Sequence, residues 1–247
     1  MTDYSFLTNP NLPDEKIIHA VVSPQYPQVI SALKELDVIS ITVKSCENVL
    51  YPLRNHTDML FSYLGSGAFA VERSQTALLN DLDCMGLRCL SESIELKPDY
   101  PFDIPLNNCI IGQYFICKSA NTPEILKQGK TVIDVKQGYA KCSCVPVDEN
   151  SLITDDLSIY NAAINFGLDA LFVRKGYIRL DGFDTGFIGG CCGKLSKDML
   201  AFFGDITKHP DYAQINSFLR ERNVYPQGLF DGELIDIGSV IPITQHS

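Results

Sequence analysis

Only one of the four histidines in the chain stands among residues that suggest chemistry. His56 lies in the run Asn55-His56-Thr57-Asp58, which we expect to open a β-hairpin. Since residues two apart on a strand share a face, the His56 imidazole and the Asp58 carboxylate would point into the same space. This pairing is typical of general acid–base chemistry, in which a carboxylate orients an imidazole that moves a proton. The alternative is a polar turn with a solvated histidine.

Nine cysteines offer candidate nucleophiles, because a thiolate attacks electrophilic carbon readily. The strongest candidate is Cys142 in the run Gly138-Tyr139-Ala140-Lys141-Cys142-Ser143-Cys144. Cys144 shares its strand face, so a zinc site with His56 as the third ligand is an alternative, although structural zinc prefers four ligands at longer spacings.

A glycine-rich run at 189–193 carries two further cysteines, Cys191 and Cys192. The run lacks the pattern of a phosphate-binding loop. We favour small residues packed where strands crowd together, and keep either cysteine as a reserve nucleophile.

Acidic residues precede two of the later hairpins that we expect in the chain. Asp181 and Asp184 lead into one of them, and Asp236 leads into the last strand region. Loop carboxylates are usually solvated, but carboxylates placed around a thiol and an imidazole would suit a cationic substrate.

The composition limits the classes of partner. The chain has 247 residues, with 20 Lys+Arg against 30 Asp+Glu and a net charge of −10. Nucleic-acid binding draws on clustered lysine and arginine, so an acidic chain argues against it. No apolar run reaches the roughly 20 residues that span a bilayer, and the N-terminal residues lack a signal-peptide pattern. We expect a cytoplasmic protein with reduced thiols, no cofactor or bound metal, and no nucleic-acid or membrane partner.

The elements that must position these side chains recur along the chain as a helix followed by three short strands. Helical periodicity predicts helices at 26–37, 74–86, 123–129, 156–167 and 210–223. The strand after each helix is expected at 39–43, 94–96, 131–135, 170–173 and 223–225. Hairpins are expected to pair 57–61 with 68–71, 109–111 with 114–117, 142–147 with 151–154, and 187–191 with 199–203.

The fifth unit has only the run 235–243 before the sequence ends, while a strand at 17–22 stands unassigned. A ring whose last unit is completed by the N-terminal strand accounts for both, because closure removes exposed sheet edges. The repeats therefore predict an α/β fold, a five-bladed propeller of βαββ-type units with pseudo-fivefold symmetry, in a single domain over residues 1–247. A mixed α/β domain with coincidental spacing is the alternative. In a ring, equivalent positions converge on the axis, which would bring Cys142 towards His56.

On these motifs the chain resembles the guanidino-group-modifying superfamily, the penteins, which includes dimethylarginine dimethylaminohydrolase, arginine deiminase and agmatine deiminase. His56-Thr57-Asp58 is similar to the family's His-x-Asp, whose histidine is the general acid/base. Gly138 to Cys142 is similar to its Gly-x-x-x-Cys, whose cysteine is the nucleophile. The family fold is a five-bladed α/β propeller with a polar axial site, and the likeness is greatest to an uncharacterised group with this fold.

The resemblance implies an amidinohydrolase or amidinotransferase-like enzyme that acts on a small cationic guanidino compound, such as an arginine derivative. It implies Cys142, His56 and Asp58 as catalytic residues. It implies substrate-binding roles for a second set of residues, Asp181, Asp184, Asp236 and Asn55.

Two features depart from the family pattern. In those enzymes the cysteine lies near the C-terminus, whereas about two units follow Cys142, as though the ring were circularly permuted. The run 238–245 is similar to the cysteine segment of agmatine deiminases but has Pro242 in place of the cysteine.

The alternative function is a non-catalytic binding or scaffold protein of the ribosome anti-association factor type. Self-association as a homodimer is left open.

Overall fold

The computed structural model describes residues 4–247, apart from the side chain of Glu92. One unit of the fold illustrates how its elements form. Strands β10 (Cys144–Asp148) and β11 (Ser151–Thr154) pair antiparallel, helix α4 (Leu157–Asn165) follows, and β12 (Asp169–Phe172) returns parallel to β11. The Asp156 carboxylate caps α4 by accepting hydrogen bonds from the amides of Ser158 and Ile159, at 2.8 and 3.1 Å.

The same order of pairing recurs in the sheets of the described residues. One unit comprises β4 (Phe61–Gly65), β5 (Ala68–Glu72), α3 (Thr76–Cys84) and β6 (Arg88–Ile94). The next comprises β7 (Cys109–Ile111), β8 (Tyr114–Cys117), the 3₁₀ turns η2 (Ser119–Asn121) and η3 (Glu124–Lys127), and β9 (Thr131–Asp134). Another comprises β14 (Cys192–Lys194), β15 (Met199–Phe202), η4 (Ile206–Lys208), α5 (Tyr212–Arg220) and β16 (Tyr225–Gly228).

The remaining unit is built from both ends of the chain. Strand β2 (Ile17–Val22) pairs antiparallel with the C-terminal β18 (Val240–His246) and parallel with β3 (Ile39–Thr42), which follows α1 (Pro27–Glu35). Strand β1 (Tyr4–Phe6) covers the other edge of β18. The predicted pairing of the N-terminal strand with the last unit is confirmed.

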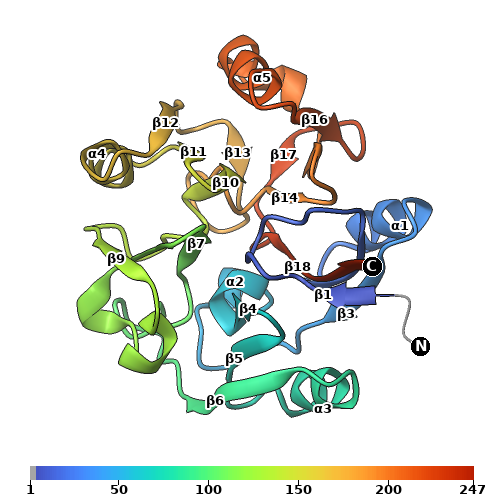
Figure 1. Cartoon of the computed structure of the whole chain (residues 1–247), viewed down its shortest axis with the longest axis vertical. Coiled ribbons are helices and arrows are strands. Elements are labelled where there is room, and N and C mark those ends of the chain that lie inside the picture. The colour runs from blue at the N-terminus through green and yellow to red at the C-terminus, as the bar shows by residue number, and fades with distance from the viewer. Residues whose placement is uncertain (1–3) are drawn as a thin grey trace.

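The units lie around a common centre, with β4, β7, β10, β14 and β18 nearest to it (Figure 1). The described residues form a mixed α/β fold whose apolar core lies between these inner strands and the helices outside them. A short parallel pair, β13 (Ile178–Arg179) and β17 (Leu234–Ile235), links two neighbouring units. Within residues 4–247, the helices are too short or too polar to cross a bilayer.

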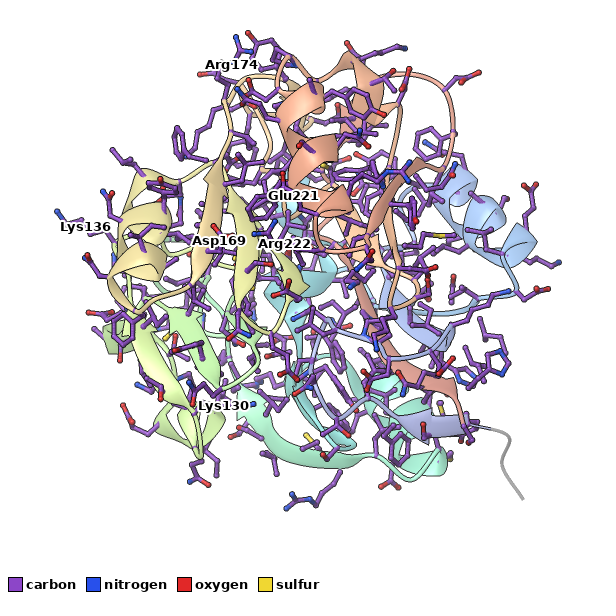
Figure 2. The ribbon with its side chains drawn as sticks, turned by 45° about the horizontal axis from the view of Figure 1, so that its top comes forward. Lys130, Lys136, Asp169, Arg174, Glu221 and Arg222 are labelled. Carbon is purple, nitrogen blue, oxygen red and sulfur yellow. The ribbon has the colours of Figure 1, made fainter. Side chains whose placement is uncertain are left out.

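An ionic cluster on the surface joins two neighbouring units. The Arg222 guanidinium follows α5, faces Asp169 of β12 and lies 3.7 Å from Asp148 of β10 (Figure 2). It also donates to the Phe218 carbonyl at 2.7 Å. These contacts hold the outer edges of the two units together.

Several predicted elements are wrong in kind or in extent. Residues 57–60 form a helical turn, α2 (Thr57–Leu60), preceded by the 3₁₀ turn η1 (Tyr51–Leu53), and the strand begins only at Phe61. The predicted helix at 123–129 is reduced to η3, in which Pro123 is the cap rather than the first helical residue. The strand predicted at 94–96 is wrong except for Ile94, which ends β6. The strand predicted at 187–191 is wrong, because residues 188–191 form a turn and β14 begins only at Cys192. The strands predicted from 142 and 223 begin at Cys144 and Tyr225.

Candidate active site

Four of the predicted site residues meet in the buried centre of the molecule. His56 precedes α2, Asp58 lies in α2, Cys142 lies in the turn before β10, and Asp236 follows β17. Their exposed fractions are 1, 1, 3 and 0 %. Side chains from distant parts of the chain therefore share one low-dielectric space, in which charges interact strongly.

The Cys142 thiol contacts Asp58 rather than His56. Its Sγ lies 3.1 Å from Asp58 Oδ2, to which it donates a hydrogen bond. Burial, with the Asp58 and Asp236 carboxylates nearby, raises the pKa of Cys142 well above its ordinary value, so the thiol is protonated here. The helical turn directs Asp58 Oδ2 to the thiol rather than to His56, although the charge of Asp58 still favours the protonated form of His56.

Asn107 is the residue that sequence reasoning missed beside Cys142. Its Nδ2 donates to Cys142 Sγ at 3.1 Å and to the Asp58 carbonyl at 3.2 Å. Its Oδ1 accepts from the amides of Lys141 and Cys142, at 2.8 and 3.3 Å. Asn107 stands two residues before β7, as Cys142 stands two residues before β10. This equivalent position in the repeat is the sequence feature from which Asn107 could have been predicted as a site residue.

Hydrogen bonds between the units run all the way round this centre. The Asp58 amide donates to the Gly238 carbonyl at 3.0 Å, the Ser239 amide to the Gly190 carbonyl at 2.9 Å, and the Gly190 amide to the Cys142 carbonyl at 2.9 Å. The Asn107 carboxamide supplies the two remaining links: its Oδ1 accepts from the Cys142 amide, and its Nδ2 donates to the Asp58 carbonyl. We call this closed series of hydrogen bonds the axial hydrogen-bond ring; in it the Asn107 side chain takes the place that a backbone peptide group takes in the other units.

His56 and Asp236 form a second pair. The His56 Nδ1 lies 3.7 Å from Asp236 Oδ1 and has no hydrogen-bond partner. Burial lowers the pKa of His56, against the opposing charge of Asp58. The amides of Phe187 and Gly238 each donate to Asp236 at 3.0 Å. Burial nonetheless raises the pKa of Asp236 to about 6.

Asp155 is a further buried carboxyl that sequence reasoning missed. It follows β11 directly, and its Oδ2 accepts from the Ile188 amide at 3.1 Å while Oδ1 has no partner. Burial raises the pKa of Asp155 to about 7, although Lys175 opposes the shift. Successive amides, Phe187 and Ile188, are therefore bound by two carboxyls from different units. Its neighbour Asp156 carried an ordinary helix-cap signal, which hid Asp155 in the sequence.

The glycine-rich run packs against this centre. A Cβ on Gly190 would lie 2.0 Å from Asp236 Oδ1, and one on Gly189 would lie 2.4 Å from the carbonyl oxygens of Lys141 and Cys144. These positions tolerate only glycine, as the favoured interpretation expected. The thiols of Cys191 and Cys192 donate to the Ile188 carbonyl, at 3.2 and 3.3 Å.

Three predicted substrate-binding residues lie outside the buried cluster. Asp181 and Asp184 are exposed on the loop after β13, where Asp181 pairs with Arg179 at 2.8 Å. Asn55 is half-buried next to His56. Among the described residues, no three His, Cys, Asp or Glu side chains are arranged to hold a metal ion.

A model of a known protein family covers most of this sequence. The model of a protein family described as a family of unknown function, DUF6873, matches residues 21–241. The chain belongs to DUF6873. No curated protein matches this DUF6873 chain in sequence.

Solved structures with the pentein fold match the DUF6873 chain over most of its length. SxtG, an amidinotransferase of the saxitoxin pathway of Microseira wollei, has a TM-score of 0.56 at 11 % identity over 95 % of this chain and 96 % of its own. The agmatine deiminase of C. jejuni has a TM-score of 0.54 at 8 % identity, over 100 % and 98 %. The dimethylarginine dimethylaminohydrolase of Pseudomonas aeruginosa, in complex with citrulline, has a TM-score of 0.52 at 10 % identity, over 94 % and 100 %. The predicted resemblance to the penteins is confirmed at the level of the fold.

Proposed function

We propose that this protein binds a small cationic guanidino compound at its buried centre and transforms it through Cys142, as an amidinohydrolase or amidinotransferase. The observation that carries the proposal is the state of two carboxyls, Asp155 and Asp236. Both are buried, and within residues 4–247 neither forms an ion pair with lysine or arginine. A planar guanidinium offers several donors in a fixed fork, which suits two carboxylates held by adjacent backbone amides.

The Phe187 side chain supports a cationic ligand. Its ring lies 6.0 Å from the Tyr139 ring and already has the Lys175 ammonium 5.4 Å from its centre, and the Phe187 amide binds Asp236. An aromatic face attracts a cation, most strongly where water is excluded. Asp236 keeps its predicted substrate-binding role here, and Asp155 takes the place of the loop acids Asp181 and Asp184.

The chemistry would begin at Cys142. The thiol proton passes to a neighbouring base, Sγ forms a bond to the central guanidinium carbon, and the bond from that carbon to the departing amine breaks with its electron pair going to nitrogen. The same proton then reaches the amine through His56. Water would then displace the sulfur and give a ureido product, whereas a second amine would accept the amidino group. Asn107 donates to Sγ and would stabilise the thiolate.

The non-catalytic alternative has one observation in its favour. Cys142 is only 3 % exposed, and burial raises the pKa of its thiol well above the ordinary value. A binding protein would need the acidic centre but no reactive thiol, so reactivity separates the two functions.

We infer that the units form a single closed five-bladed propeller over residues 4–247. The axial hydrogen-bond ring supports closure, since each of its links joins two neighbouring units. The split unit supports it too, because β2 and β18 come from opposite ends of the chain.

The proposal is tested by brief treatment with chloroacetamidine, a cationic thiol reagent, followed by mass spectrometry of the peptides. Cys84 is exposed and serves as the reference thiol within the same molecule. Faster labelling of Cys142 than of Cys84, competed by agmatine or arginine, is expected. Iodoacetamide, which is uncharged, should instead favour Cys84. Labelling confined to Cys84 with both reagents would contradict the enzymatic function and favour the binding protein.

A further inference from the structure

A buried lysine lies next to the candidate nucleophile. The Lys141 side chain is 4 % exposed, and its Nζ donates to Ser239 Oγ at 2.9 Å. Ser239 Oγ lies 3.0 Å from Asp58 Oδ2 and 2.8 Å from the Gly189 carbonyl. A lysine is rarely buried unless its charge is compensated, so the groups around Lys141 must offset the cost of burying its ammonium.

The contacts give the hydrogen bonds a direction. An ammonium only donates, so Ser239 Oγ accepts from Lys141 and keeps one proton of its own to donate. Asp58 Oδ2 is the acceptor for the Cys142 thiol as well as a neighbour of Ser239. The single Ser239 proton lies between two acceptors, Asp58 Oδ2 at 3.0 Å and the Gly189 carbonyl at 2.8 Å. These contacts connect the ammonium through a hydroxyl to the carboxylate and then to sulfur.

The charge on Lys141 persists in this environment. Burial by itself lowers the pKa of Lys141, but its interactions with the Cys109 thiol and the Asp58 carboxylate raise it above its ordinary value. Burial raises the pKa of Asp58, and His56 and Lys141 oppose that shift. The ammonium therefore favours the ionised form of Asp58.

We propose that Lys141 is a positioning residue for the reaction at Cys142: acting through Ser239, it keeps the Asp58 carboxylate ionised and directed at the thiol, and Asp58 accepts the thiol proton. This inference rests on the proposed function. In the step itself the S–H bond breaks, the proton passes to Asp58 Oδ2, and the electron pair stays on Sγ as a thiolate. Asn107 Nδ2, 3.1 Å away, then donates to that thiolate.

The geometry assigns this task to Asp58 and not to His56. The carboxylate is within hydrogen-bond distance of Sγ, whereas the His56 Nδ1 lies towards Asp236. His56 remains available to pass the proton held by Asp58 on to a departing amine. The titratable groups that face Cys142, Asp58 or Lys141 from the surrounding elements are His56, Tyr139, Asp236, Cys109 and Cys192.

The test is the rate of Cys142 alkylation by iodoacetamide between pH 6 and 10, followed by peptide mass spectrometry. In alkylation the sulfur bonds to carbon, iodide leaves with its electron pair, and the thiol proton ends in solvent, so the rate follows the thiolate population. Lys141→Met should slow labelling about tenfold at pH 8 and move the profile about one pH unit upward. Lys141→Arg should restore most of the rate.

Ser239→Ala keeps the ammonium and removes only the linking hydroxyl. It should shift the profile in the same direction as Lys141→Met, which a purely structural role of Lys141 would not produce. It also keeps the test available if Lys141→Met fails to fold. Lys194→Met is the matched control: Lys194 is 5 % exposed, and its Nζ donates to the Val147 carbonyl at 2.9 Å, outside this line of contacts.

The outcomes separate this inference from the proposed function. Profiles of Ser239→Ala and folded Lys141→Met that coincide with the unmodified protein would overturn the role of Lys141. In that case, preferential labelling of Cys142 by chloroacetamidine would still support the proposed function. If Cys142 in the unmodified protein resists both reagents up to pH 10, the proposed function fails, and this inference fails with it.

Discussion

The two halves of the buried centre balance their charges in different ways. In the thiol half, formed by Asp58, Cys142, Asn107, Lys141 and Ser239, a lysine ammonium stands one hydroxyl away from the carboxylate. In the carboxyl half, formed by His56, Asp155 and Asp236, two acids share the space with an imidazole whose pKa is lowered by burial. Asp155 Oδ1 and His56 Nδ1 have no hydrogen-bond partner there, and in the thiol half Asp58 Oδ1 has none.

The difference indicates what each half is prepared for. A buried polar atom without a partner costs free energy of folding, about 1–3 kcal/mol by comparison with mutational data. The thiol half has its cation built in, and so is prepared for proton transfer. In the carboxyl half, within residues 4–247, neither acid is ion-paired with a lysine or arginine, although Lys175 and Lys141 lie close enough to lower the pKa of Asp155 and Asp236. This half is therefore prepared for binding a cation.

Replacing the sulfur breaks the thiol half most completely. Cys142→Ser should lower turnover of a guanidino substrate at least about ten-thousandfold, because a buried serine hydroxyl is a far weaker nucleophile than a thiolate. Substrate binding, measured by calorimetry, should survive because the carboxyl half is intact. Cys144→Ser, two residues away, is the control; equal loss in both variants would indicate a folding defect instead.

Removing one acid from the carboxyl half should stabilise the empty protein. With the pKa of Asp155 at about 7 in the fold and 3.8 in the unfolded chain, the folded state alone holds this proton between those pH values. Stability therefore falls as pH rises through that window. Asp155→Asn should remove this loss and raise the free energy of unfolding at pH 8 by up to about 4 kcal/mol.

Urea unfolding at pH 5 and pH 8 measures this effect. The difference between Asp155→Asn and the unmodified protein should be larger at pH 8 than at pH 5, by about 3 kcal/mol. A variant that is destabilised equally at both pH values would show that the Asp155 carboxylate is already satisfied.

Binding separates the buried acids from the loop acids. Asp236→Asn should weaken binding of a guanidino ligand about a hundredfold, since it removes a buried charge that would pair with the cation. Asp184→Asn, on the exposed loop, should change binding less than twofold. Binding to the unmodified protein should strengthen as pH rises through about 6 to 7, where Asp236 and Asp155 lose their protons. A larger loss of affinity in Asp184→Asn than in Asp236→Asn would show that the ligand binds at the exposed loop instead.

The smallest expected effect concerns the link between the halves. Asn107→Ala removes two steps of the axial hydrogen-bond ring and leaves buried groups without partners, so it should lower the free energy of unfolding by about 2 kcal/mol. Asn107→Asp keeps the acceptor but places a negative charge next to Sγ, so it should also slow Cys142 alkylation. Thermal unfolding and the alkylation rate measure the two effects; a change in neither would remove Asn107 from the site.

Sequence periodicity was sufficient for the repeating units and for bringing His56 and Cys142 into one space. It could not give the details that depend on contacts between units. Residues 57–60 form a helical turn because the chain must bend into β4, and this turn directs Asp58 to the thiol. Lys141 and Ser239 are 98 residues apart, so no local pattern relates them. Asp181 and Asp184 matched Asp236 by place in the repeat, yet their loop is exposed.

The split unit also bears on how the molecule folds. β2 at residues 17–22 gains its central partner only when β18 at 240–246 has been made, so that pairing closes a loop of more than 200 residues. During synthesis β2 is made long before β18, so the edge of β2 that pairs with β18 stays uncovered until the end of the chain has been made. Contacts so distant in sequence slow folding. The rate at which the two chain ends meet, and not the chemistry of the centre, then sets how quickly a competent molecule appears.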